Sequence, residues 1–205
     1  MKFLKKRSNA VLIAVAVAIL ATVLGVYGSL TRLSRDIERL FYDGVYLEEE
    51  GYTQPSINSQ LEIQANAALN LASIMRDYPE LDAQTDRLLS TRDDLLNSKF
   101  ITGKAMHSNN MQSAFYSLLR ASKSAELSER ELTAAKRYFE TFSDSQTFVA
   151  RNAGPNYNVK VSGLRHETGF PASLISYVIP VTGPEAFFPN SYPKDTYPDP
   201  DFVFP

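Results

Sequence analysis

The hydrophobic pattern begins with an uninterrupted apolar run. Residues 10–27 hold no charged side chain, and the run extends to Leu30. About 20 helical residues span the hydrocarbon core of a bilayer, and a helix satisfies its own backbone polar groups there. The pattern therefore predicts a transmembrane anchor over residues 10–30.

A cleaved signal peptide is the alternative interpretation of this run. Such peptides have an apolar core of about 7–15 residues and a cleavage site with small residues. The run here is longer, and Gly-Val-Tyr-Gly-Ser at residues 25–29 is a poor cleavage site. An uncleaved anchor is therefore favoured.

Charges beside the run predict its orientation. Residues 1–9 hold four basic side chains and no acidic one, and Arg32 and Arg35 on the other side weaken the contrast. By the positive-inside rule, we expect residues 1–9 to be a short cytoplasmic N-terminus and the remainder to lie outside the cytoplasm.

Small residues recur along one side of the predicted anchor. They follow one another at spacings of three and four, which places them on one helical face. Such faces allow close approach of transmembrane helices. Self-association through this face is one interpretation, and a chance arrangement of the alanines that are common in such helices is the simpler one. The residues are Ala14, Ala18, Ala21, Gly25 and Gly28.

Helical periodicity dominates residues 31–178. A segment over residues 31–41 continues the anchor, residues 46–56 are predicted to be a loop, and strand-like alternation is absent over any length. We predict an all-α fold: a transmembrane helix followed by an antiparallel bundle of about four to five long helices. The apolar stripes comprise Leu61, Ala65, Ala68, Leu69, Ala72 and Met75; Leu81, Leu88, Leu89, Leu95 and Leu96; Met111, Ala114, Phe115, Leu118 and Leu119; Leu132, Ala135, Phe139, Phe142 and Val149; and Tyr157, Val161 and Leu164.

Local signals place the ends of these helices. Ser56 or Asn58 could cap the first bundle helix, and Pro79 suits a first helical turn. A break is expected near Gly103. Residues 128–131, Ser-Glu-Arg-Glu, form a capping box, and Asn-Ala-Gly-Pro at residues 152–155 predicts a break or kink.

The last segment, residues 179–205, is rich in proline and aromatic residues. Seven prolines lie between residues 178 and 205, a density that excludes a helix. We predict an irregular tail with low order after Asn190. Its aromatic residues could dock along the bundle, through residues 184–189, contact lipid headgroups or bind a partner.

These segments together resemble the LemA family of bacterial membrane-anchored helical proteins. The likeness covers most of residues 10–188 and includes the helix at residues 65–81, which ends in Tyr-Pro-Glu-Leu, and the segment Phe41–Val45. The resemblance implies a membrane-tethered helical bundle with no known enzymatic activity and no cofactor. Structural or binding roles are implied for Tyr78, Pro79, Tyr157, Asn158, Phe170, Pro171, Phe187 and Phe188.

Simple packing accounts for several of these residues. We expect Tyr157 to pack in the bundle with its hydroxyl group near the rim. Asn158 could bridge to a neighbouring helix. Phe170 and Pro171 would end the helix that contains Tyr157.

Composition adds mainly exclusions. The 205 residues include no cysteine, which excludes disulfides, thiolate metal sites and cysteine catalysis. The net charge of −2 argues against nucleic-acid binding. His107 and His166 lie outside metal-binding patterns, and the acidic run at residues 48–50 reads as solvated surface.

We therefore expect no catalytic, cofactor or metal site. The expected function is a non-catalytic scaffold or adaptor at the bacterial envelope, with membrane lipid, envelope proteins and a second copy as partners. The alternative is an extracytoplasmic ligand-binding or sensor module whose aromatic tail closes a groove.

Overall fold

The chain is almost entirely helical where its structure is described. The computed structural model describes residues 7–167 and 183–187, and confirms the all-α prediction. The helices are α1 (Arg7–Asp43), α2 (Ile57–Met75), α3 (Asp82–Asn97), α4 (Ile101–Ala121), α5 (Glu129–Phe148) and α6 (Gly154–Glu167). Short elements complete the order: strands β1 (Val45–Leu47) and β2 (Tyr52–Gln54), 3₁₀ turns at Pro79–Leu81 and Ser122–Ser124, and a π turn at Val149–Ala153.

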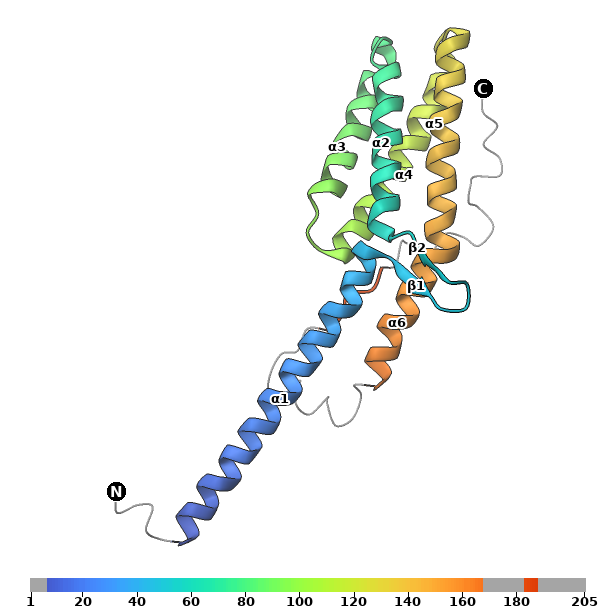
Figure 1. Cartoon of the computed structure of the whole chain (residues 1–205). Helices are drawn as coiled ribbons and strands as arrows, with labels where there is room; N and C mark the ends of the chain where they lie inside the picture. Colours follow the sequence, from blue (N-terminus) through green and yellow to red (C-terminus); the bar gives the residue numbers. More distant parts are fainter. Residues whose placement is uncertain (1–6, 168–182, 188–205) are drawn as a thin grey trace. The chain divides into compact units, whose positions relative to one another are not determined.

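The chain divides into two compact units (Figure 1). The smaller unit comprises residues 1–38 and 160–184, and the larger one residues 39–159 and 185–205. Helices α1 and α6 contribute residues to both units, whereas α2–α5 belong wholly to the larger one.

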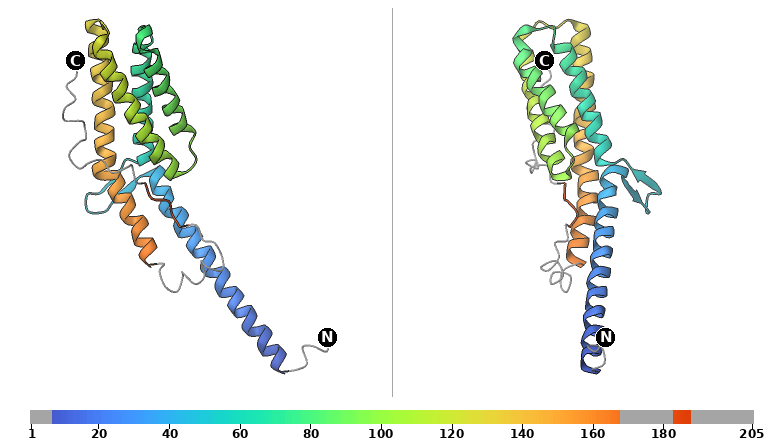
Figure 2. Two further views of the ribbon diagram at one scale, coloured as in Figure 1. Left: turned by 180° about the vertical axis from the view of Figure 1, so that it is seen from behind. Right: turned by 90° about the vertical axis from the view of Figure 1, so that its left-hand side faces the viewer.

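Four antiparallel helices form the core of the larger unit (Figures 1 and 2). Helix α2 packs closely on α5, and α3 packs closely on α4. Aromatic rings fill the seam between α4 and α5, where Phe115 and Phe142 stack with centroids 3.9 Å apart. Both rings are fully buried, so this pair lies at the centre of the helical core.

The predicted apolar stripes are confirmed except at a few edge positions. Leu81, Leu88 and Leu95 are buried, at the seven-residue spacing of one helical face. Their neighbours lie off that face because each residue turns the helix by about 100°. Thus Leu89, Leu132 and Phe139 are half-buried, and Leu69 and Leu96 are exposed.

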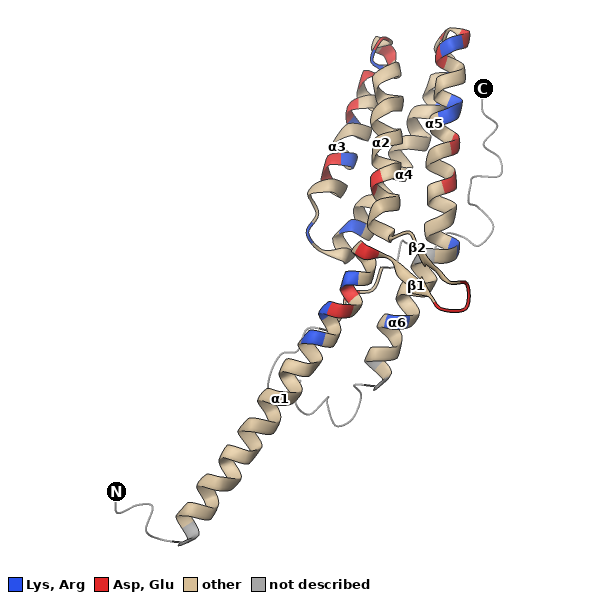
Figure 3. Ribbon diagram, viewed as in Figure 1, with Lys and Arg blue, Asp and Glu red and all other residues tan. Residues whose placement is uncertain are grey.

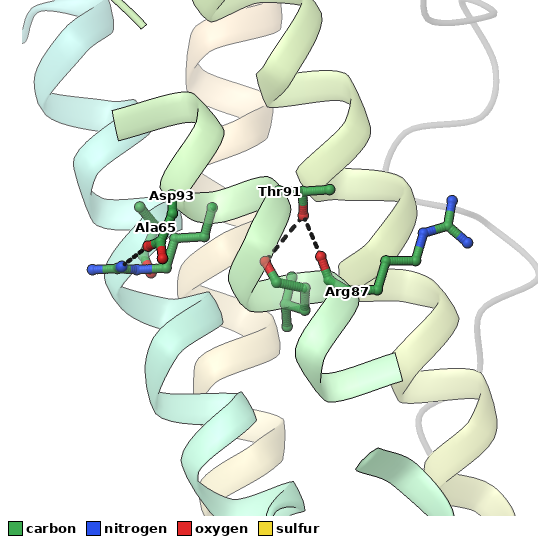
Figure 4. Close-up of polar contacts among 6 residues, drawn as sticks. Ala65, Arg87, Thr91 and Asp93 are labelled. Atoms are coloured by element: carbon green, nitrogen blue, oxygen red, sulfur yellow. Dashed lines mark hydrogen bonds and ion pairs between the residues drawn. The ribbon is translucent and has the colours of Figure 1, made fainter. Parts of the chain in front are cut away.

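Several polar contacts lie on α3, and one of them joins it to α2 (Figure 4). Arg92 Nε donates to the Ala65 carbonyl oxygen at 3.1 Å, and its Nη1 pairs with Asp93 Oδ1 at 2.6 Å. Thr91 Oγ1 donates to the Arg87 carbonyl oxygen at 3.1 Å. Arg92 therefore fixes α3 against the main chain of α2.

Two helix starts follow the sequence signals. Ser56 is the cap of α2, and its Oγ accepts from Ser59 N at 3.0 Å. The capping box of α5 is complete, since Ser128 N donates to Glu131 Oε2 at 2.9 Å and Glu131 N donates to Ser128 Oγ at 3.4 Å. The break after α3 lies earlier than predicted, at residues 98–100, and Gly103 stands in the first turn of α4.

The prediction of a loop at residues 46–56 is wrong in part, because this stretch contains strand residues. This region contains a small antiparallel hairpin in which Tyr46 pairs with Thr53 and Leu47 with Tyr52. Three-residue strands are too short to produce a visible alternation in sequence. Gly44 leads into the hairpin with φ +89, a backbone conformation that favours glycine. The turn carries the acidic run at residues 48–50 (Figure 3).

The expected break at residues 152–155 is a π turn through which the helix continues. Pro155 has no N–H group to donate to the preceding turn. The chain widens there, and Gly154 N donates to the Val149 carbonyl oxygen five residues earlier. A Cβ atom on Gly154 would lie 2.8 Å from that oxygen, which explains the glycine.

The smaller unit contains most of α1. Its apolar part is long enough to cross a membrane, and none of the most apolar stretch is buried by protein. Leu12 is 66 % exposed, and Val17 and Ile19 are each 60 % exposed. After Arg7, its first residue, α1 carries no charged residue until Arg32, and its later part holds Arg together with Asp and Glu (Figure 3). Residues 1–6, which include three of the four N-terminal cations, lie outside the described residues.

Candidate functional site

The candidate site is the place where a short segment from the end of the chain packs on the larger unit. We call Glu185–Phe187 the docked segment. Ala186 and Phe187 are buried, and Glu185 is half-buried. The predicted docking of the tail is confirmed for these residues, while Phe188 and Pro189 lie outside the described residues.

An aromatic cluster receives the docked segment. Phe41 from the end of α1, Tyr157 from α6 and Phe187 are each fully buried. The Phe41 ring centroid lies 5.9 Å from that of Tyr157 and 5.5 Å from that of Phe187. Tilted and edge-on rings at such distances attract one another beyond the effect of their burial.

Two side chains of α6 bind the main chain of the docked segment. Tyr157 Oη donates to the Glu185 carbonyl oxygen at 2.6 Å. Asn158 Nδ2 donates to the Phe187 carbonyl oxygen at 2.7 Å, and Phe187 N donates to Asn158 Oδ1 at 3.0 Å. The Asn158 amide thus satisfies both main-chain groups of Phe187, as a neighbouring β-strand would.

The Glu185 carboxylate caps a helix that lacks a local cap. Phe100, the residue before α4, offers no side-chain acceptor. Glu185 Oε2 instead accepts from Thr102 N at 2.9 Å and from Thr102 Oγ1 at 3.2 Å. An anion is favourable here because the first N–H groups of a helix lack partners and its dipole is positive at that end.

The start of α6 also contacts the hairpin. Asn156 Nδ2 donates to Gln54 Oε1 at 2.9 Å, and Gln54 is buried at the end of β2. Three successive residues of α6, Asn156 to Asn158, therefore bond to two other segments of the larger unit, the hairpin and the docked segment.

The structure brings together only part of the predicted set of family-like residues. Tyr157, Asn158 and Phe187 meet at the docked segment, as described above. Asn158 was expected to reach a neighbouring helix, but it bonds to the docked segment because that segment supplies unpaired main-chain groups. Phe170, Pro171 and Phe188 lie outside the described residues.

Tyr78 and Pro79 lie in the connection between α2 and α3. Pro79 is exposed and starts the 3₁₀ turn. Tyr78 Oη donates to Glu131 Oε2 at 2.8 Å, which links this connection to the start of α5.

The hydrogen bond between Tyr78 and Glu131 shifts the pKa values of both groups. The hydrogen bond to Glu131 raises the pKa of Tyr78, since the carboxylate favours the protonated phenol. Hydrogen bonds from Ser128, and then from Tyr78, lower the pKa of Glu131. The pair is therefore most favourable with a neutral phenol and an ionised carboxylate.

The small residues of α1 form an open face. Ala14, Ala18 and Ala21 are exposed, as are Gly25 and Gly28. A Cβ atom built on either glycine meets nothing within 4 Å in the described chain. The face is available to another molecule, but nothing on it identifies one.

Polar residues also occur inside the helical core. Tyr116 Oη donates to Gln146 Oε1 at 3.1 Å, which joins α4 to α5. Gln64 is buried, and its Oε1 has no hydrogen-bond partner in the described part of the chain. Burial lowers the pKa of Lys104, an effect that Glu62 opposes.

Among the described residues, no three His, Asp or Glu side chains are placed to hold a metal ion. His107 is half-buried in α4, and His166 is exposed near the end of α6. The two histidines therefore do not belong to a described metal-binding cluster.

Three residues of the site lack a predictive signal in the sequence. Phe41 looks like an ordinary apolar position at a helix end. Thr102 and Glu185 are 83 positions apart, and nothing local indicates that they pair. Only the absence of a good cap before α4 could have suggested a distant acceptor.

No protein-family model, curated protein or solved structure that we compared with this chain matches it. The resemblance to the LemA family therefore stays a prediction.

Proposed function

We propose that the protein is a single-pass membrane-anchored, LemA-like helical bundle that acts as a non-catalytic scaffold or adaptor at the bacterial envelope. The supporting observation is the contrast within the structure: α1 presents apolar side chains on all sides, whereas α2–α5 bury theirs. A helix that is apolar all round needs an apolar environment that these residues do not supply. Lipid provides it.

The proposed orientation has a short cytoplasmic N-terminus and an extracytoplasmic bundle. The cations at residues 1–9 support it through the positive-inside rule. Envelope proteins, and a second copy through α1, are the proposed partners. Nucleic acid is not among them, because the net charge is −2.

Protease accessibility in intact spheroplasts tests anchor and orientation together. Full-length protein carries a different tag at each end. We expect it to remain in the membrane fraction and to lose the C-terminal tag to added protease before lysis. Protection of that tag until lysis would place the bundle in the cytoplasm, and release of a shortened soluble chain would indicate a cleaved signal peptide.

Crosslinking in membranes tests the adaptor role. Affinity purification after crosslinking should recover specific envelope proteins, compared with a control in which an unrelated soluble domain follows the same residues 1–38. Recovery of the protein alone would contradict an adaptor role.

One observation favours a second candidate, a ligand-binding or sensor module whose tail closes a groove. The docked segment covers an aromatic cluster and is itself buried. In that case, a ligand should change hydrogen exchange at Phe187 when membrane extracts are added to the purified protein. Unchanged exchange over all extract fractions would contradict this candidate.

A further inference from the structure

We propose that the surface under the docked segment is a peptide-binding site that the chain occupies with its own residues. Its partner would be an extended segment of another protein that carries an acidic, a small and an aromatic residue in succession. This inference rests on the proposed role of the bundle as an interaction module, because it specifies what such a module would bind.

The site binds main-chain atoms of the docked segment. Tyr157 and Asn158 make three hydrogen bonds, all to carbonyl or N–H groups of Glu185 and Phe187. Another polypeptide segment with the same backbone conformation presents the same groups at the same spacing. Addition of a segment through main-chain bonds, with pockets for alternate side chains, is a recurring mode of peptide recognition.

The side chains at the two ends of the docked segment, Glu185 and Phe187, make the contacts that would select a partner segment. The carboxylate position faces the uncapped start of α4, where Thr102 N and Oγ1 donate to it. The aromatic position fills the space beside Phe41, at 5.5 Å between ring centroids. Ala186 between them is buried, so a small residue is expected there.

The docked segment belongs to the same chain as the site that it fills. A site filled by a segment of the same chain experiences a high effective concentration of its own occupant. A partner segment therefore has to compete with residues 185–187. Only a partner segment that binds the site more tightly than residues 185–187 occupy it would displace them.

The test uses full-length protein in detergent micelles and a fluorescent peptide with the sequence of residues 183–188. The triple variant Glu185→Gly, Ala186→Ser, Phe187→Gly removes the competing carboxylate and aromatic ring and places a polar side chain at the buried position of Ala186. We expect saturable peptide binding to this variant, at least about tenfold tighter than to the unchanged chain. A peptide with glutamine for the glutamate and alanine for the first phenylalanine should bind about tenfold more weakly or worse.

Asn158→Asp in the triple variant supplies the matched loss of function. It replaces a donor by an acceptor opposite the Phe187 carbonyl position, and peptide affinity should fall about tenfold or more. Asn70→Asp is the control, since Asn70 is exposed on α2, and it should leave affinity unchanged.

Three results would overturn the inference. They are no peptide binding to the folded triple variant, equal binding with and without Asn158→Asp, and a triple variant that does not fold. The last would make the docked segment part of the core rather than an exchangeable occupant. If peptide binding is absent while crosslinking still recovers envelope proteins, the proposed site is wrong and the adaptor role stands. If the peptide binds but crosslinking recovers no envelope protein, the site binds peptides and the adaptor role is wrong.

Discussion

The apolar part of α1 and the four helices α2–α5 use similar residues in opposite ways. Val17 and Ile19 are each 60 % exposed, whereas Leu71, Leu88 and Leu118 are fully buried. The difference lies in periodicity, because α1 is apolar on all sides and the bundle helices are apolar on one side. Hydrophobic content alone therefore does not identify a core; a stripe that other helices cover does.

The comparison separates two sources of stability. The bundle helices gain free energy by burying their stripes against one another, which amounts to about 1.5–3 kcal/mol for each large apolar side chain. The described chain offers no such burial to residues 10–22 of α1. Their favourable burial has to come from another phase or molecule.

The largest expected effect is on the membrane association of α1. Replacing Val17 and Leu20 together by arginine should release the protein from the membrane, because each arginine near the centre of a spanning helix costs about 2.5–3.5 kcal/mol. Extraction of membranes with alkaline carbonate measures the effect. Leu33→Arg is the control, as Leu33 is 48 % exposed on α1 but lies beyond the apolar run. Retention of the double variant in the pellet would show that α1 is held by protein instead.

The next effect concerns the aromatic seam of the bundle. Phe142→Ala should lower the free energy of unfolding by about 3–5 kcal/mol, since it removes a fully buried ring stacked on Phe115. Phe139→Ala is the matched control one helical turn away. Phe139 is half-buried, and its ring lies edge-on to that of Tyr116 with 6.3 Å between the ring centroids. We therefore expect the free energy of unfolding of this variant to fall by about 1–2 kcal/mol. Equal losses in chemical denaturation would mean that the assigned buried face of α5 is wrong.

A smaller effect is expected at the junction between α1 and the hairpin. Gly44 and Gly51 have φ values of +89 and +69, and alanine in this region costs roughly 1–2 kcal/mol. Gly44→Ala should cost more, since its Cβ atom would lie 2.2 Å from the Gln54 carbonyl oxygen, whereas Gly51 has open space. Thermal unfolding compares the two variants. A larger loss for Gly51→Ala would contradict the hairpin geometry.

The smallest effect concerns the Tyr78–Glu131 contact at the far end of the bundle helices. Glu131 has a lowered pKa, so its stabilisation is present above the ordinary value of 4.5 and is lost as pH falls through the lowered pKa. Tyr78 has a raised pKa, so its stabilisation is present below 10.0 and is lost as pH rises through the raised pKa. Tyr78→Phe should remove the alkaline loss and reduce the acid loss.

The pH dependence of the unfolding free energy tests this pair. Tyr46→Phe is the control, because Tyr46 is 60 % exposed on β1. An alkaline loss that persists unchanged in Tyr78→Phe would assign it to another group.

Much of the fold follows from local sequence. The seven-residue spacing of Leu81, Leu88 and Leu95 predicts a buried stripe, and the Ser128–Glu131 capping box predicts the start of α5. Single residues at stripe edges were harder to place. Leu69 and Leu96 are as apolar as their neighbours, and only the position of the facing helix decides which side is covered.

The candidate site was predictable in part. Tyr157, Asn158 and Phe187 stood out through the family resemblance, and docking near residues 184–189 was expected from the aromatic tail. The partner of Asn158 was not predictable, because an amide side chain carries no information about which of many main-chain groups it will meet.

By itself, the sequence determined the all-α class, the apolar run of α1, the helical stripes and the caps of α2 and α5, because these depend on residues within a few turns of one another. Tertiary structure alone decided the pairing of Glu185 with Thr102, the meeting of Phe41 with Phe187, and the two bonds of Asn158. Those contacts join residues 29 to 146 positions apart, whose proximity depends on how whole helices pack rather than on any local preference.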